Sequence, residues 1–161
     1  MSKNLNKKEA PLAMPAEGKV EFSFRASELV NIKQACQALR DFRHCGIDTM
    51  RKFHANNKLL ATALEEVSDE EEVLRDLHTI IYGPEASKLS PEELAARTKE
   101  FKKANKEYGV REYSIHLYTV PNSVFEPHLA DESKFPKKTI NNTEIDTLVA
   151  YLDLCSEGII T

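Results

Sequence analysis

Several residue types that would point to a special fold or location are scarce or absent in this 161-residue chain. It has no tryptophan and only five glycines, which argues against turn-rich sandwiches and barrels. Its three cysteines are an odd number and lie far apart, which argues against a disulfide framework and fits a reducing cytosol. No run of 18 apolar residues occurs, and residues 1–19 have no apolar signal core. We therefore expect a cytoplasmic protein without a membrane segment.

A basic excess is also missing, because the net charge is −4 at pH 7. Nonspecific binding to nucleic acid usually needs such an excess, so nucleic acid is a partner that the composition does not favour. Hydrophobic residues make up 41% of the chain and charged residues 30%. This balance allows a core and leaves many solvent-facing helix surfaces. The length fits one domain of ordinary size.

Hydrophobic periodicity predicts an α+β fold that is mainly helical. Residues 19–26 alternate apolar and polar side chains, which indicates a half-buried strand. A second strand is expected at 110–120, where the period changes from 3.6 to 2. The two should pair as a small antiparallel sheet, because a lone strand would leave its backbone groups without partners. Residues 1–18 are predicted to be a flexible N-terminal arm, and residues 19–161 a single domain.

Two helices are predicted to form an αα-hairpin with a tight turn between them. The first covers residues 27–45 and ends before Gly46, which supplies the left-handed conformation of a helix end. Asp48 is expected to cap the second. "SDEE" at 68–71 has the pattern of a capping box and predicts the start of a third helix.

Two more helices are expected toward the C-terminus. "SPEE" at 90–93 combines a cap, a proline at the first helical position and a glutamate at the third, and it predicts a helix over 91–108. The closing helix is expected to be capped by Asn142 or Thr143. Between them, residues 121–140 contain three prolines and no period, and a long loop of that kind is uncommon unless it is functional or disordered.

Two asparagines interrupt heptad patterns that are otherwise largely apolar. Asn57 lies in the second helix and Asn105 in the fourth. A polar residue in a seam costs stability but can determine register or partner number. Burying an amide without a partner costs a few kcal/mol (about 1–3 by protein mutational data). We therefore expect both amides to have hydrogen-bond partners, within this chain or in an assembly.

The stretch "LRDFRHCGIDTMRKFHANNKLL" at 39–60 brings His44, Cys45 and His54 together. A structural zinc site needs about four ligands, and no CxxC or HxxxH spacing occurs here. A helix C-terminus also disfavours a cysteine thiolate. The simplest interpretation is a corner between two helices, and no catalytic, cofactor-binding or metal-ligating residue is assigned. His116, on the second strand, is the centre of an alternative in which the protein is a small enzyme with a site on the sheet face.

Basic residues gather on and just after the helix at 91–108. A basic helix face can meet phosphates, although the chain lacks interleaved aromatic residues for base stacking. A nucleic-acid-associated protein is therefore a second alternative. The residues are Arg97, Lys99, Lys102, Lys103, Lys106 and Arg111.

Three segments together resemble an uncharacterised family of small proteins from tailed bacteriophages. They are "FSFRASELVNIKQACQALRDF", "RKFHANNKLLATALEEV" and "INNTEIDTLVAYLDL". The N-terminal arm and the proline-containing loop at 121–140 depart from that family. The resemblance implies no activity and no site residues. It implies a phage origin, and so a protein of the host cytoplasm or a virion component.

The leading hypothesis is a non-enzymatic, protein-binding accessory protein that is phage-encoded. It would be a virion or assembly component, or an inhibitor of a host protein. The expected contacts are the N-terminal arm and four residues of the loop, because apolar side chains in a mobile loop can anchor an interface. If so, deleting residues 121–136 should leave a cooperative fold and abolish binding. The four residues are Phe125, His128, Leu129 and Phe135.

Overall fold

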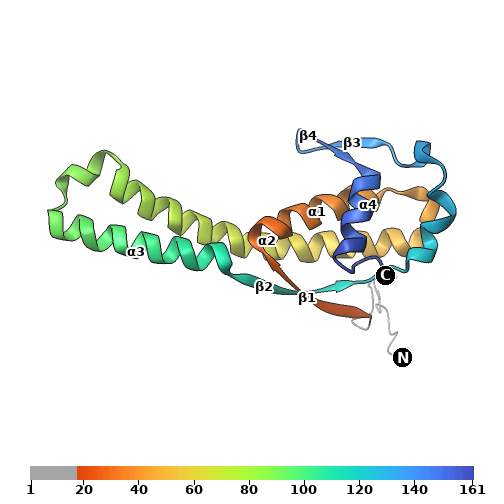
Figure 1. The fold of residues 1–161 in the computed structure, drawn as a ribbon, viewed down its shortest axis with the longest axis horizontal. Coiled ribbons are helices and arrows are strands. Elements are labelled where there is room, and N and C mark those ends of the chain that lie inside the picture. Colours follow the sequence, from red (N-terminus) through yellow and green to blue (C-terminus); the bar gives the residue numbers. More distant parts are fainter. Residues whose placement is uncertain (1–17) are drawn as a thin grey trace, which may run out of the picture.

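The fold is mainly helical α+β, as predicted, and the computed structural model describes residues 18–161 (Figure 1). The predicted N-terminal arm lies outside the described residues except for Gly18. The elements in chain order are β1 (Lys19–Arg25), α1 (Ala26–Arg40), α2 (Ile47–Tyr82), α3 (Pro91–Val110), β2 (Glu112–Tyr118), β3 (Lys137–Ile140), β4 (Thr143–Asp146) and α4 (Thr147–Ser156).

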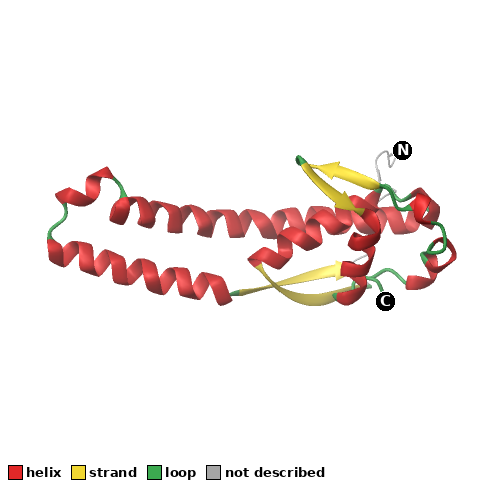
Figure 2. Ribbon diagram, turned by 45° about the horizontal axis from the view of Figure 1, so that its top comes forward, coloured by secondary structure: helices red, strands yellow, loops and turns green. Residues whose placement is uncertain are grey.

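The molecule has a head and a projecting arm, and α2 belongs to both. This helix has 36 residues, so it is roughly 54 Å long at 1.5 Å per residue. Its N-terminal part packs against α1 and β2, and α4 packs on α1 (Figure 1). Its second half runs away from these elements with α3 antiparallel beside it (Figures 1 and 2). We call residues 68–110 the arm and the rest of 18–161 the head.

The third helix predicted from "SDEE" does not exist as a separate element, because α2 continues through Ser68. No glycine or proline occurs between residues 47 and 82, so nothing breaks the helix. Ser68, Asp69 and Glu71 are exposed, and polar side chains on a solvent-facing side are tolerated in a helix interior. The helix ends before Gly83, which forms its C-cap. A side chain there would meet the carbonyl oxygen of Thr79 at 2.3 Å.

The predicted antiparallel sheet is confirmed, and it closes one side of the head. In the register of β1 and β2, Phe22 lies opposite Ile115 and Phe24 opposite Tyr113. Phe24, Tyr113 and Ile115 are buried. Their neighbours along each strand are polar and face solvent, as the alternation predicts. The sheet therefore contributes one apolar face to the core.

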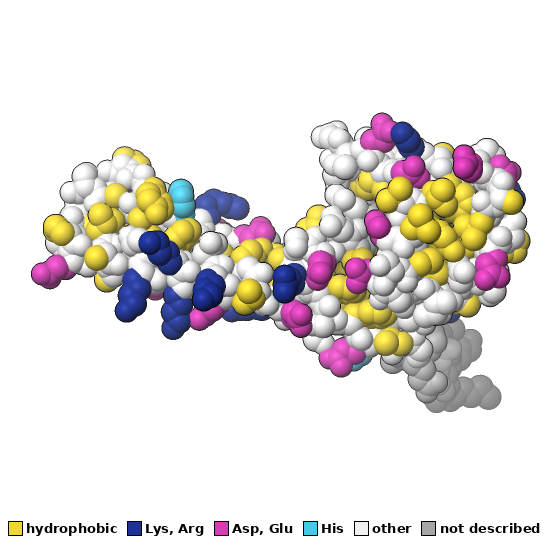
Figure 3. All heavy atoms as spheres, in the orientation of Figure 1, with side chains coloured by type: hydrophobic (Ala, Val, Ile, Leu, Met, Phe, Trp, Pro, Cys, Tyr) yellow, Lys and Arg dark blue, Asp and Glu magenta, His cyan; other side chains and the backbone are white. Residues whose placement is uncertain are grey.

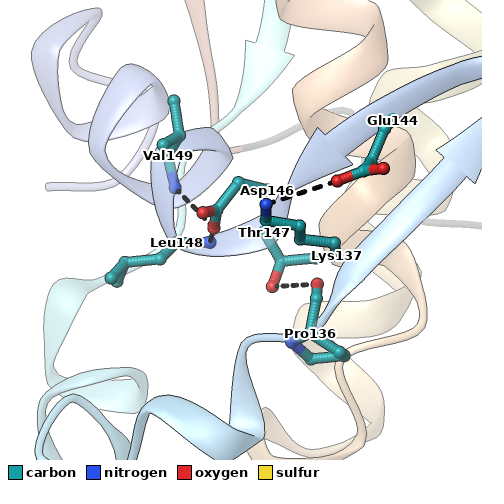
Figure 4. A network of polar contacts seen from close by, with 7 residues as sticks. All are labelled: Pro136, Lys137, Glu144, Asp146, Thr147, Leu148 and Val149. Atoms are coloured by element: carbon teal, nitrogen blue, oxygen red, sulfur yellow. Dashed lines mark hydrogen bonds and ion pairs between the residues drawn. The ribbon is translucent and has the colours of Figure 1, made fainter.

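The closing helix begins later than predicted, because a second small sheet precedes it. Asn141 and Asn142 have φ of 50° and 63° and form the two-residue turn between β3 and β4, a type of turn that favours asparagine. They therefore cap no helix. Asp146 caps α4 instead, accepting from the backbone N–H of Leu148 at 2.9 Å. Figure 4 shows this cap, with Thr147 Oγ1 donating to the Pro136 carbonyl at 2.9 Å.

The asparagine that matters to the fold is Asn56, which the heptad analysis missed. Its Nδ2 donates to the carbonyl of Tyr118 at 2.9 Å, and the N–H of Tyr118 donates to its Oδ1 at 2.8 Å. The side chain is fully buried, so it clamps α2 to the end of β2. Within the described residues, Asn57 Oδ1 is buried and accepts no hydrogen bond, so the expected partner is not found there. Asn105 is exposed on α3, and a partner for either amide in an assembly stays a prediction.

We expect Asn56→Ala to lower the free energy of unfolding by about 3 kcal/mol, because it removes two hydrogen bonds from buried peptide groups. Urea unfolding followed by circular dichroism measures this change.

The neighbouring Asn57→Ala is the matched control. It removes an oxygen that has no partner and introduces a better helix former, so the cost should stay under about 1 kcal/mol. Equal losses in the two variants would show that the clamp has no special role.

Candidate functional site

The loop predicted to contact a partner is instead part of the core. Phe125 is fully buried and Phe135 nearly so. The Phe42 ring stacks on Phe135 with centroids 4.8 Å apart and lies 5.6 Å from Phe125. Short 3-10 turns at 122–124, 126–128 and 132–134 order the segment. A partner cannot reach buried rings in the folded chain. Phe125 and Phe135 are therefore core residues rather than the contact residues that the sequence predicted.

His128 and Leu129, the other two expected contact residues, are half-buried in the same segment. A partner contact through them stays a prediction. The deletion of residues 121–136 can no longer be expected to leave a cooperative fold. It would remove two core aromatic residues, and loss of one such residue costs about 3–5 kcal/mol.

The corner at residues 40–47 is a helix junction, as its pattern indicated. The helix α1 ends at Arg40, earlier than predicted. A 3-10 turn at Arg43–Cys45 follows, and Gly46 has a φ of +84°. The fold also brings His44 to His128, with ring centroids 5.4 Å apart. Across residues 18–161, no three His, Cys, Asp or Glu side chains gather in a way that could hold a metal ion.

Cys45 is poorly suited to act as a nucleophile. Its Sγ donates to the Val124 carbonyl at 3.2 Å, and burial raises the pKa of the thiol to about 12. A thiol is reactive only as the thiolate. The third histidine of that stretch, His54, is exposed on α2, so the three residues quoted together in the sequence do not form one site.

His116 lies on the exposed face of β2, opposite Glu21 in the register. The same face carries a hydrogen bond from Ser23 Oγ to Glu112 at 3.0 Å and one between Ser114 and Glu21. The alternative of a small enzyme with a site around His116 stays a prediction.

The arm is the largest part of the described chain that the core does not cover. The helix α3 has 20 residues and not one of them is buried. Leu94, Phe101 and Tyr108 are only half-buried where they face α2. The arm thus consists of two helices that share one apolar seam, with no second layer of protein over it.

Large apolar side chains on the arm remain in water. Val73 is 59% exposed, Tyr82 62% and Val110 62%, and Ile80 is exposed as well. Val73 lines a shallow groove together with Ala104 and Tyr108, between the two helices. The arm therefore exposes large apolar side chains on more than one of its faces, and exposed apolar surface of sufficient size can mark an interaction site.

Polar contacts tie the root of the arm to the head. Tyr108 donates to Glu71 at 2.6 Å, Tyr113 donates to Glu70 at 3.0 Å, and Arg111 forms an ion pair with Glu70. Burial first, and then the hydrogen bond to Glu71, raise the pKa of the Tyr108 phenol. These contacts hold the start of β2 against the middle of α2, so they determine where the arm leaves the head.

Charge is distributed unequally between the two helices of the arm. Acidic residues concentrate on α2, and Lys and Arg side chains gather over α3, as Figure 3 shows for one face. Two of the six predicted basic residues have acidic partners, because Arg111 pairs with Glu70 and Arg97 with Glu100 at 3.2 Å. The other four have no ion pair within the described range, and all four are exposed: Lys99, Lys102, Lys103 and Lys106.

Comparisons with models of known protein families, with curated proteins and with solved structures return no match to this chain. No helix of residues 18–161 is both long enough and apolar enough to cross a bilayer. The surface that sequence reasoning missed is the apolar part of the arm. The signal for it was the absence of any helix breaker over residues 47–82, which predicts a helix longer than the head can cover.

We expect Cys45 in the native chain to react with iodoacetamide much more slowly at pH 8 than the same residue does in urea. A pKa near 12 leaves a thiolate fraction roughly a thousandfold smaller than that of an ordinary cysteine. Mass spectrometry of the labelled peptides measures each cysteine separately. Labelling of Cys45 at equal rates in the two conditions would contradict the assigned environment.

Proposed function

We propose that this chain is a non-enzymatic accessory protein that binds another protein through the arm, residues 68–110. The observation that carries the proposal is a 20-residue helix without one buried residue, beside exposed Val73, Ile80 and Tyr82. Most helical stability in proteins comes from packing of an apolar face. A hairpin with a single seam therefore gains stability when a partner covers its remaining apolar surface.

The shape of the molecule supports the same proposal. The arm projects from the head (Figure 1), so a partner can contact both of its faces and its tip without contacting the core. We place the contact surface on the arm rather than on the four loop residues expected from the sequence, because two of those residues, Phe125 and Phe135, are buried. Binding of the partner protein would be driven by burial of apolar surface, which contributes a free energy of about 25 cal/mol per Å². The entropy cost of association offsets part of this gain.

A phage origin, with the chain as a virion component or as an inhibitor of a host protein, is kept as part of the proposal on the resemblance alone. The nucleic-acid alternative is the second candidate, and the observation that favours it is the set of exposed lysines on α3. Its signature would be an affinity that falls steeply with salt.

We expect an arm variant, Val73→Ser, Ile80→Ser and Tyr82→Ser, to lose the partner protein while keeping its melting temperature within a few degrees, because all three side chains are exposed. Formaldehyde crosslinking in the native host, followed by purification of the tagged full chain and mass spectrometry, measures the loss.

The matched control replaces two exposed apolar residues of the head, Val149→Ser and Leu152→Ser, and it should retain the same crosslinked protein. The proposal fails if the arm variant keeps the partner, if the head variant alone loses it, or if the wild-type chain crosslinks to no protein.

A further inference from the structure

One flank of α3 combines an apolar groove with a basic border. The groove has a volume of about 580 Å³. Its apolar floor comes from residues near the N-terminal end of the helix, and two lysines border it. The lining residues are Pro91, Leu94, Ala95, Thr98, Lys99 and Lys102.

Helical spacing extends this flank beyond the groove. Residues 91, 95, 98 and 102 recur at intervals of four, three and four, so they form one row along the helix. Lys106 continues the row four residues further on, and Lys99 lies beside it. Three of the four acidic residues of α3, Glu93, Glu100 and Glu107, follow one another every seven residues on a different side of the helix. The fourth, Glu92, is seven residues before Lys99 and lies beside the row at the N-terminal end of the helix. The flank is therefore basic although the chain as a whole is acidic.

The two faces of the arm differ in what they present. Val73 and Ala104 share the groove on one face. Tyr82 is nine residues after Val73, and Ala95 is nine residues before Ala104. Nine residues make two and a half turns at 3.6 residues per turn, so Tyr82 and Ala95 point to the opposite face. Tyr82 is 62% exposed there, and its ring lies 4.7 Å from that of His78.

We propose that this face, with Tyr82, Leu94 and Ala95 as its apolar part and Lys99, Lys102 and Lys106 as its basic border, binds an acidic amphipathic helix of the partner protein. The inference rests on the proposed function and names the chemistry of the partner. Apolar residues at helical spacing on the partner would cover the groove, as in helix-in-groove recognition. Its acidic residues would meet lysines that have no acidic partner in the described chain.

A protein helix fits this face better than nucleic acid does. The groove floor is apolar, and a phosphate backbone would leave it uncovered. The neighbouring helix α2 carries Glu71, Glu72 and Asp76, which would repel a polyanion extending across the arm. An amphipathic helix is narrow enough, at about 10–12 Å with its side chains, to lie on α3 and avoid those carboxylates.

The test uses the full chain and a fluorescent 18-residue synthetic peptide with leucine at positions 3, 7, 10 and 14 and mostly glutamate elsewhere. A scrambled peptide of the same composition and a 20-base-pair duplex of random sequence are the comparison probes. Fluorescence anisotropy should show saturable binding of the first peptide, and binding of the other two at least about tenfold weaker.

Two matched charge reversals locate the site. Lys99→Glu with Lys102→Glu should weaken binding of the peptide about tenfold or more. Arg43→Glu with Lys58→Glu makes the same change of charge at exposed positions of the head and should change it less than twofold. All four side chains are exposed, so both variants should fold, which circular dichroism checks.

Four results would overturn the inference: no saturable binding at 1 mM peptide, equal binding of the scrambled peptide, equal or tighter binding of the duplex, or an equal loss in both charge variants. The proposed function is judged separately, by the crosslinking of the wild-type chain, the arm variant and the head variant. An arm that captures a protein but does not bind the acidic peptide would keep the function and reject this partner chemistry.

Discussion

The constraint on which the rest of the structure depends is that α2 is longer than anything available to cover it. Thirty-six residues without a glycine or proline form one straight element, and helix formation is cooperative once begun. The head elements pack on α2 from its N-terminal end to near Glu70. The remainder of the helix therefore leaves the head, and α3 is the one described element that accompanies it along its length.

Two groups of hydrogen bonds and ion pairs attach the head to α2. Asn56 clamps the end of β2 to the first half of α2 through two buried hydrogen bonds. Near the middle of α2, Glu70 and Glu71 hold residues at the end of α3 and the start of β2. The chain from α3 into β2 is thus attached to α2 on both sides of the point where the arm begins. A load applied to the arm by a partner would reach the head through these contacts.

Residues 119–161 close the head, which explains why a proline-containing segment without a period is ordered. Phe125 and Phe135 fill the space beside Phe42 and Tyr151. The C-terminal residues run next to Val120, whose N–H donates to the Ile159 carbonyl at 2.8 Å. The aromatic rings of this segment are therefore structural, and a surface for binding has to be sought on the arm.

Local sequence patterns predicted the structure correctly where one residue type favours one backbone conformation. The strand alternation at 19–25 and the cap at Ser90 both correspond to structure. The patterns gave wrong predictions where the same short sequence is compatible with two conformations. "SDEE" starts a helix or sits within one, and "NNT" caps a helix or turns a hairpin, depending on what packs nearby. The heptad analysis chose Asn57 over Asn56 because a seam pattern cannot tell which of two adjacent positions faces a strand distant in the sequence.

The sequence by itself determined the mainly helical content and the paired strands, because these follow from backbone propensity and from the periodicity of apolar residues. Only the tertiary structure decided which apolar residues are covered. Phe125 is buried and Tyr82 is exposed, although a sequence ranks both as hydrophobic aromatic residues. The physical reason is that burial depends on contacts between segments far apart in the chain, and those contacts end where the head ends.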